Sequence, residues 1–358
     1  MKTRNSTELK RRLEGRWLGA FKALAPSLDS AIDKLGDNVP CPVDGGTDGF
    51  RLFKDANYTG GGVKQSWRVL PEGIDMLMWV NNWSFTKVYD ELDAWLGNKP
   101  VEARPICIAK PKPVDETSLR KWLNRIWKEA LPLDDLMAFP ARAYFKYRWI
   151  NNAASAASDI RFHPCLNYKD KQGKLLGRFG AVLILVRNNN GEPVSIHRTF
   201  ITQGGLKVNL DGPHKPRKLT PPVNKSSKGR HVRLFTHQNG YLGVSEGLES
   251  ALAVREAKQF PVWPGLSNTM LQSFVPPKGV HTVLNFVDKD RNKTGENTAI
   301  ILRANLIQEG IRVFDLLPPT PILSSDEKGV DWADQLKRDK NGFGLIDEVL
   351  DFAQLKYA

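Results

Sequence analysis

The sequence contains little cysteine and no long apolar run, and both shortages limit what it can be. Its 3 cysteines, at positions 41, 107 and 165, are too widely separated to predict a disulfide framework or a zinc cluster. No run of about 18 apolar residues appears, and Met1–Ser6 lacks an apolar signal core. We therefore expect a cytoplasmic protein without a membrane partner.

A second absence concerns nucleotide-driven motors. The sequence has no Gly-x-x-x-x-Gly-Lys-Ser/Thr segment, the loop with which P-loop ATPases cradle phosphates. This absence excludes a P-loop ATPase within the sequence.

Acidic residues are fewer than basic ones. The chain has 52 Lys and Arg against 39 Asp and Glu, a net charge of +13, which favours polyphosphate partners such as nucleic acids. The excess is concentrated in residues 204–233, which hold a single acid, Asp211, and a set of basic residues: Lys207, Lys215, Arg217, Lys218, Lys225, Lys228, Arg230 and Arg233. This segment is also rich in Gly, Pro and Ser, so we expect a mobile basic loop that binds phosphates, with a solvated linker as the alternative.

The few acids form a distinctive pattern at the ends of two apolar segments. Glu246 and Gly247 follow the apolar residues 241–244 and precede a helix-like segment, and Asp288 and Asp290 follow Val283–Val287 about 40 residues later. In an open α/β sheet the carboxyl ends of the strands line the ligand crevice, so these three carboxylates should converge there. Crowded carboxylates are typical of a site for Mg²⁺, which Mn²⁺ can replace.

A third acidic element, Gly329–Asp331, follows the Pro-rich turn Leu316–Pro319. The ordered set resembles the TOPRIM domain of DnaG-type primases, topoisomerases and some nucleases. The resemblance implies that Asp288, Asp290 and Asp331 bind the metal and that Glu246 is either a general base or a further ligand. One departure is that Lys293 stands where the family often has Gly. We interpret Glu249 as a surface carboxylate in the first turn of a helix.

The front of the chain resembles the zinc ribbon of primases from phages and plasmids. It carries the segment Val39–Phe50, rich in Gly, and a second Gly-rich stretch before Lys64. Of the four ligand positions only Cys41 remains, and the others are occupied by Asp44, Lys64 and Trp67. A lysine ammonium is not a zinc donor, so we expect a ribbon fold without structural zinc. It either contacts template, through Arg51, Lys54, Lys64 and Arg68, or serves only for docking.

Between the ribbon-like segment and the acidic motifs, the sequence predicts a helix at residues 119–131 and a hairpin whose strands flank the turn Asn188–Gly191. This order resembles the region ahead of TOPRIM in primases of mobile elements, which implies a basic wall that binds nucleotides or template. Arg198 matches the hairpin-end arginine of that family, with an internal salt bridge as the alternative reading. The remaining predicted nucleotide- or template-binding residues are Arg178, Lys207, Lys225, Lys228 and Arg230.

We therefore predict an α/β protein with α+β N-terminal parts. The expected domains are a degenerate ribbon (1–98), a linker (99–117), the basic half of a primase core (118–240), a TOPRIM domain (241–320) and a C-terminal part with the third acidic motif and a helix (321–358). The expected function is Mg²⁺-dependent synthesis of RNA primers from ribonucleoside triphosphates on single-stranded DNA, for a phage, plasmid or other mobile element. Because the sequence has no P-loop, we expect a separate helicase or replication initiator to unwind the duplex. The alternatives are a TOPRIM nuclease and a non-catalytic single-stranded DNA-binding replication regulator.

Overall fold

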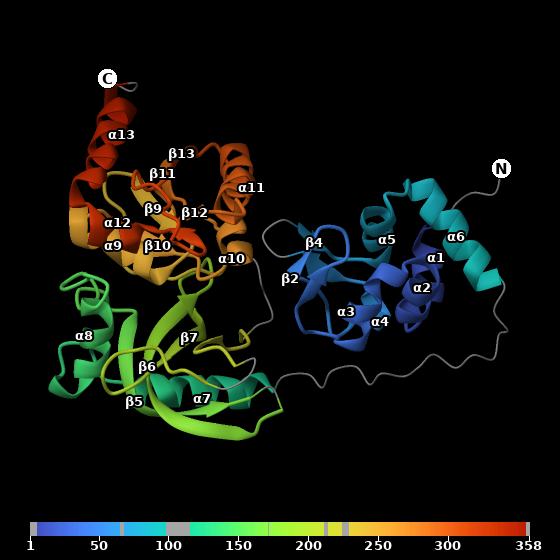
Figure 1. Cartoon of the computed structure of the whole chain (residues 1–358), viewed down its shortest axis with the longest axis horizontal. Coiled ribbons are helices and arrows are strands. Elements are labelled where there is room, and N and C mark those ends of the chain that lie inside the picture. Colours follow the sequence, from blue (N-terminus) through green and yellow to red (C-terminus); the bar gives the residue numbers. More distant parts are fainter. Residues whose placement is uncertain are drawn as a thin grey trace. The chain divides into compact units, whose positions relative to one another are not determined.

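The computed structural model describes residues 6–64, 68–97, 115–170, 172–210, 214–223 and 229–355. The chain divides into two compact units, Met1–Val114 and Asp115–Ala358 (Figure 1). No described helix is both long enough and apolar enough to cross a membrane. Residues 99–114 of the expected linker lie outside the described residues, and the helix that follows begins at Glu116, within the expected linker.

The first unit packs helices against a small antiparallel sheet. The sheet has the strand order β1 (Val39–Cys41), β2 (Gly45–Leu52), β3 (Gly62–Lys64) and β4 (Arg68–Leu70). The accompanying helices are α1 (Ser6–Leu13), α2 (Trp17–Leu24), α3 (Asp29–Asp33), α4 (Ala56–Thr59), α5 (Gly73–Asn81) and α6 (Phe85–Gly97). The short antiparallel strands agree with the ribbon fold expected from the sequence.

The core of this unit is built around Trp17, which is 2% exposed. The first residue of α5, Gly73, lies so close to the indole that an added Cβ would come within 2.2 Å of a ring carbon. Gly60, with a φ of 68°, ends α4 and lies against Gly73. Two glycines therefore allow α2, α4 and α5 to meet at one buried tryptophan.

The second unit begins with an antiparallel sheet between two helices. Its strands are, in order, β5 (Ile160–Lys169), β6 (Leu175–Arg187), β7 (Pro193–Ile201) and β8 (Arg217–Leu219). One face packs on α7 (Glu116–Glu129) through Leu183, Leu185 and Phe200. The other packs on α8 (Phe139–Lys146) through Val182, Ile184 and Ile201. The hairpin is present, but β8 pairs with β7, so the basic segment 204–233 is only partly a loop.

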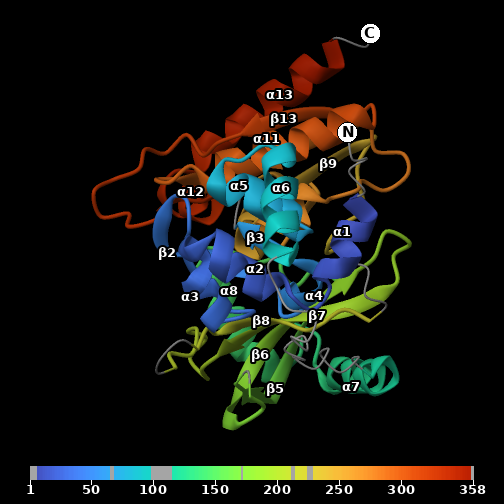
Figure 2. The same ribbon diagram turned by 90° about the vertical axis from the view of Figure 1, so that its right-hand side faces the viewer.

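A parallel sheet follows, with the strand order β10 (Val262–Pro264), β9 (Tyr241–Ser245), β11 (Thr282–Phe286) and β13 (Arg312–Leu316). Leu284 and Phe286 face a core shared with α9 (Leu248–Lys258), α12 (Trp332–Arg338) and α13 (Gly344–Leu355). Val283, Leu242 and Val244 face α10 (Asn268–Gln272) and α11 (Thr294–Gln308). Helices therefore cover both faces, which confirms the predicted α/β class (Figures 1 and 2).

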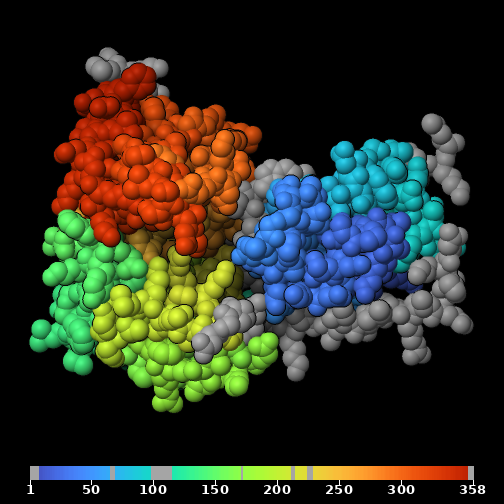
Figure 3. All heavy atoms as spheres, viewed as in Figure 1, coloured from blue at the N-terminus to red at the C-terminus, as the bar shows by residue number. Residues whose placement is uncertain are grey.

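The two sheets of the second unit belong to one body. Residues of α8 and β6 share a single buried core with α9 and α12. The space-filling view shows the green and yellow antiparallel-sheet part in direct contact with the orange and red parallel-sheet part (Figure 3). This shared core fixes the position of side chains from one part relative to those of the other.

Candidate active site

The strand order brings the predicted acids together. Strands β9 and β11 are parallel and in register, Ser245 opposite Phe286, so Glu246 and Asp288 leave the sheet at the same edge. The short strand β12 (Lys289–Asp290) pairs with β14 (Gly329–Val330), which places Asp331 near Asp288 and Asp290. The prediction that parallel strand ends gather these carboxylates therefore holds in the structure.

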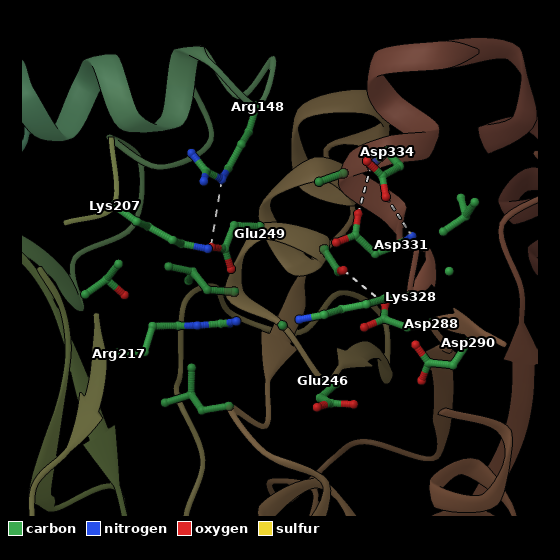
Figure 4. Close-up of a pocket in the computed structure, with 18 of the residues that line it drawn as sticks. Arg148, Lys207, Arg217, Glu246, Glu249, Asp288, Asp290, Lys328, Asp331 and Asp334 are labelled. Atoms are coloured by element: carbon green, nitrogen blue, oxygen red, sulfur yellow. Dashed lines mark hydrogen bonds and ion pairs between the residues drawn. The ribbon is translucent and has the colours of Figure 1, made fainter. Parts of the chain in front are cut away.

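The acids line a cavity of about 710 Å³ between the two parts of the second unit. Figure 4 shows the carboxylates of Glu246, Asp288, Asp290, Asp331 and Asp334 on the parallel-sheet side. The opposite side, which we call the cationic wall, carries Arg148, Lys207 and Arg217 (Figure 4). Lys328 extends into the space between them. The cavity thus has one wall of each charge.

Neighbouring donors orient several of the carboxylates. The Ser250 hydroxyl donates to Asp288 Oδ1 at 3.2 Å, and the backbone N–H of Gly295 donates to Asp290 Oδ2 at 3.0 Å. Gly295 must be glycine, because a Cβ there would lie 2.2 Å from the carbonyl oxygen of Asp288. Asp331 caps α12, accepting from the backbone N–H of Asp334 at 2.8 Å.

Burial and mutual repulsion make these carboxylates hard to ionise. Burial, followed by the charge of Asp290, raises the pKa of Glu246 to about 7. Burial and the charges of Asp331, Glu246 and Asp290 raise the pKa of Asp288 well above its usual range. Burial and the charge of Asp334 raise the pKa of Asp331 to about 6. Such a cluster favours a bound cation, since positive charge removes the repulsion.

The donor set suits Mg²⁺ better than a metal fully enclosed by protein. Across the part of the chain that the structure describes, no three His, Cys, Asp or Glu side chains gather closely enough to enclose a metal ion. Mg²⁺ is usually bound through one or two carboxylates while water and substrate phosphates complete its shell. Asp288 and Asp290, carboxylates at the edge of a roomy cavity, fit that requirement.

The cationic wall contains one predicted residue, Lys207, and two that sequence reasoning did not single out. Lys207 follows β7, Arg148 follows α8, and Arg217 begins β8. The positive charge of Arg217 acts to lower the pKa of Glu246 across the cavity. Arg217 was noted in the sequence only as one of the basic residues of segment 204–233. Arg148 lies in a mostly aromatic segment, where no motif indicated a role in binding.

Arg198 is not among the residues that line the cavity. Side chains alternate along β7, so His197 and Thr199 face the cavity while Arg198 shares the other face with Ile196 and Phe200. Its guanidinium lies over the rings of Trp122, at 5.4 Å, and Phe200, at 5.9 Å. The Arg198 side chain thus lies away from the carboxylates of the cavity. The apolar residues that share its face of β7 could have predicted this from the sequence.

The other predicted basic residues are also away from the cavity lining. Arg178 is exposed on β6, and Arg230 is half-buried just before the residues that pair with Arg187. Lys225 and Lys228 lie outside the described residues.

Glu249 corrects a sequence interpretation. It does lie in the first turn of α9, but its side chain is only 12% exposed and faces the cationic wall, where Lys207 Nζ lies 3.3 Å from its Oε1. Burial opposes its ionisation, yet Lys207 and a hydrogen bond from Tyr144 hold the pKa of Glu249 at about 2. It is a buried, paired carboxylate rather than a solvated one.

Comparison with protein families agrees with this geometry. Residues 241–341 match the model of the Toprim domain. This part of the chain is a Toprim domain. Residues 36–64 match the zinc-binding domain of primase-helicase, and residues 117–230 match a domain of unknown function. The predicted resemblance to Toprim-containing primases with a ribbon is confirmed, and the Toprim match extends far enough to include Asp331. An origin in a mobile element stays a prediction.

Several solved structures are similar to the chain at low sequence identity, whereas no curated protein sequence matches it. The zinc-binding and RNA polymerase domains of the Aquifex aeolicus primase are 15% identical, with 94% of this chain and 85% of that one covered and a TM-score of 0.44. The primase fragment of the bacteriophage T7 primase-helicase protein is 14% identical, with 86% and 97% covered and a TM-score of 0.34. A DnaG catalytic domain bound to single-stranded DNA is 16% identical, with 63% and 77% covered and a TM-score of 0.43.

The ribbon residues do not fit the zinc ion that the family match implies. The Lys64 ammonium forms an ion pair with the Asp44 carboxylate, and Cys41 Sγ lies 3.7 Å from the same carboxylate. A protonated lysine has no lone pair for zinc, and structural zinc needs four good donors. The ion pair therefore joins β3 to the turn after β1 where the family uses metal. Trp67, the fourth position, lies outside the described residues.

Proposed function

We propose that this protein is a primase, which joins ribonucleoside triphosphates into short RNA primers on single-stranded DNA. The observation that carries the proposal is the cavity itself, where a Toprim carboxylate cluster faces a wall of cations. The chain also matches a zinc-binding domain of primase-helicase, and this second match favours primer synthesis over the other activities of Toprim proteins.

The cationic wall would bind the triphosphate. Arg217 offers a planar guanidinium that suits two phosphate oxygens at once, and Lys207 offers a point charge. Both extend from the antiparallel-sheet part toward the Toprim carboxylates (Figure 4). A triphosphate between the walls would have its charged oxygens near these cations and its α-phosphate toward the acids.

The carboxylates opposite the cationic wall, which we call the acidic wall, would act on the α-phosphate where the new bond forms. Asp288 and Asp290 would hold Mg²⁺, with Asp331 acting through water in the metal's shell, and the ion when bound supplies neutralisation of phosphate charge. In the transfer, the 3′-hydroxyl oxygen of one nucleotide forms a bond to the α-phosphorus of the next, and pyrophosphate leaves with the electrons of the broken P–O bond. The hydroxyl proton goes to Glu246, whose pKa of about 7 suits a proton acceptor near neutrality, or to water if Glu246 binds the metal.

Template binding is the remaining part of the proposal. The net charge of +13 and the exposed cations of the second unit, Arg178 among them, favour single-stranded DNA. With no P-loop in the sequence, a separate helicase or initiator would expose that strand.

Primer synthesis tests the proposal. The full chain is incubated with single-stranded DNA, labelled ribonucleoside triphosphates and Mg²⁺ or Mn²⁺, beside Asp290→Asn and Arg217→Gln. Asp347→Asn is the matched control, because Asp347 lies in α13 and pairs with Lys258 outside the cavity. We expect short RNA from the parent and the control only. Cleavage of the DNA instead would indicate a Toprim nuclease, and binding without either product would indicate a replication regulator.

A further inference from the structure

One acid of the cavity faces the cations instead of the other acids. Glu249 belongs to α9 of the Toprim domain, and its Oε1 lies 3.3 Å from Lys207 Nζ and 3.9 Å from Arg148 Nε. The same oxygen accepts a hydrogen bond from the Tyr144 hydroxyl. All three partners belong to the antiparallel-sheet part, so Glu249 is a point at which the two walls of the cavity are joined.

The three partners also contact one another. Arg148 lies over the Tyr144 ring at 3.9 Å and donates from Nη1 to the Tyr144 carbonyl at 2.7 Å. The Lys207 ammonium lies 5.8 Å from the centre of that ring. Tyr144 is 1% exposed, so it is a rigid support for both cations. The position of the cations thus depends on one buried aromatic and one buried carboxylate.

Burying this carboxylate is favourable only because it is paired. An isolated buried charge is strongly destabilising, and removal of one partner leaves the others uncompensated. Around Glu249, one negative charge is shared between two positive ones. The cluster keeps a net positive charge that is available for an anion.

We propose that Glu249 is a positioning residue that holds Lys207 and Arg148 at a set distance from the Toprim acids, so that a triphosphate spans the gap in a reactive geometry. This inference rests on the proposed function, because the spacing matters only if a polyphosphate binds between the walls. It makes two opposite predictions for Glu249→Gln. Loss of the negative charge makes the cavity more attractive to polyphosphate, whereas loss of the anchor makes transfer slower.

The same helix offers a matched control. Glu256 of α9 also joins the Toprim domain to the antiparallel-sheet part, since its Oε2 accepts from the backbone N–H of Asn152 at 2.9 Å and of Ala153 at 2.8 Å. It does not line the cavity. Glu256→Gln therefore weakens a contact between the parts, since a neutral amide oxygen accepts less strongly than a carboxylate, without changing the charge that a ligand meets.

The test measures binding and transfer separately on the full chain. Binding of inorganic tripolyphosphate is measured by titration calorimetry without divalent metal, for the parent, Glu249→Gln, Glu249→Asp and Glu256→Gln. We expect Glu249→Gln to bind about 5-fold more tightly, the effect of one unit charge at short range in a partly solvated cavity. Primer synthesis by the same variant should show a kcat at least about 10-fold lower with no increase in KM. Glu249→Asp should regain part of kcat, and Glu256→Gln should match the parent in both.

Weaker or unchanged tripolyphosphate binding by Glu249→Gln would overturn the inference, as would a parent protein that does not bind tripolyphosphate at all. Tighter binding together with a parent that makes no primers would support the positioning of the cations while contradicting the proposed function. If Glu249→Gln does not fold, Glu249→Asp tests the anchor alone, because it retains the charge but withdraws it from Lys207 and Arg148 by one methylene, so its kcat should fall below that of the parent. An equal kcat for that variant and the parent would then contradict the inference.

Discussion

The carboxylate cluster should make the metal-free protein less stable as the pH rises, and Glu246→Gln should remove part of that loss. The pKa of Glu246 is raised from 4.5 to about 7. Between these values the folded chain holds more protons than the unfolded chain, so stability falls as the pH increases. A pKa that is raised by about 2.5 pH units lowers the free energy of unfolding by at most about 3 kcal/mol.

Other groups titrate in the same range, so the comparison between variants is what matters. Burial lowers the pKa of His197 to about 4, and a depressed histidine pKa makes stability rise with pH up to about its unfolded value. This opposing contribution is common to the parent and to Glu246→Gln. The difference between the two proteins therefore isolates the carboxylate.

Calorimetric unfolding of the full chain in chelator, from pH 4.5 to pH 8, provides the measurement. We expect Glu246→Gln to gain up to about 3 kcal/mol over the parent across this range, whereas Asp347→Asn, which is outside the cavity, should follow the parent. Addition of Mg²⁺ at pH 8 should stabilise the parent and do so less for Asp288→Asn. Parallel pH profiles for the parent and Glu246→Gln would show that burial and the charge of Asp290 do not raise the pKa of Glu246.

Three further predictions concern the rest of the chain. Gly73→Ala should destabilise the first unit by about 3 kcal/mol or more through its clash with Trp17, whereas Gly97→Ala, where a Cβ meets nothing within 4 Å, should not, as thermal unfolding would show. Lys293→Gly should raise the unfolding free energy by about 1 kcal/mol in denaturant titrations, because Lys293 has a φ of 56°, and an unchanged midpoint would contradict this. Metal analysis of the purified protein should find far less than one zinc per chain, given that Lys64 pairs with Asp44, and stoichiometric zinc would show that the ribbon retains a site.

The carboxylates of the acidic wall could be predicted from the sequence because they follow strands directly. Once residues 241–245 and 282–286 are recognised as parallel strands, Glu246 and Asp288 must share an edge of the sheet. The departure at Lys293 was also visible, and the structure explains it: the lysine adopts the left-handed conformation that a glycine would adopt more easily. These predictions needed only the order of residues along each strand and the register between the two strands.

The cationic wall could not be predicted in the same way because it depends on which face of a strand or helix meets the Toprim domain. Arg198 was chosen by resemblance, although alternation with Ile196 and Phe200 places it on the face toward α7. Arg148 and Glu249 meet across about 100 residues of sequence, through the packing of α8 on α9. Only the tertiary structure shows that a carboxylate one helical turn from Glu246 faces the opposite wall.

If this cavity joins two nucleotides, the first product that it forms is a dinucleotide, and that product can be measured. The full chain is mixed with single-stranded DNA, Mg²⁺ and two ribonucleoside triphosphates complementary to adjacent template bases, and products are identified by mass spectrometry. We predict a template-dependent dinucleotide that retains the 5′-triphosphate, with an equal amount of pyrophosphate, and neither product from Asp288→Asn. A parent protein that binds the template but forms no dinucleotide would contradict the proposed function. An Asp288→Asn variant that forms the dinucleotide at the parent's rate would contradict the proposed role of Asp288.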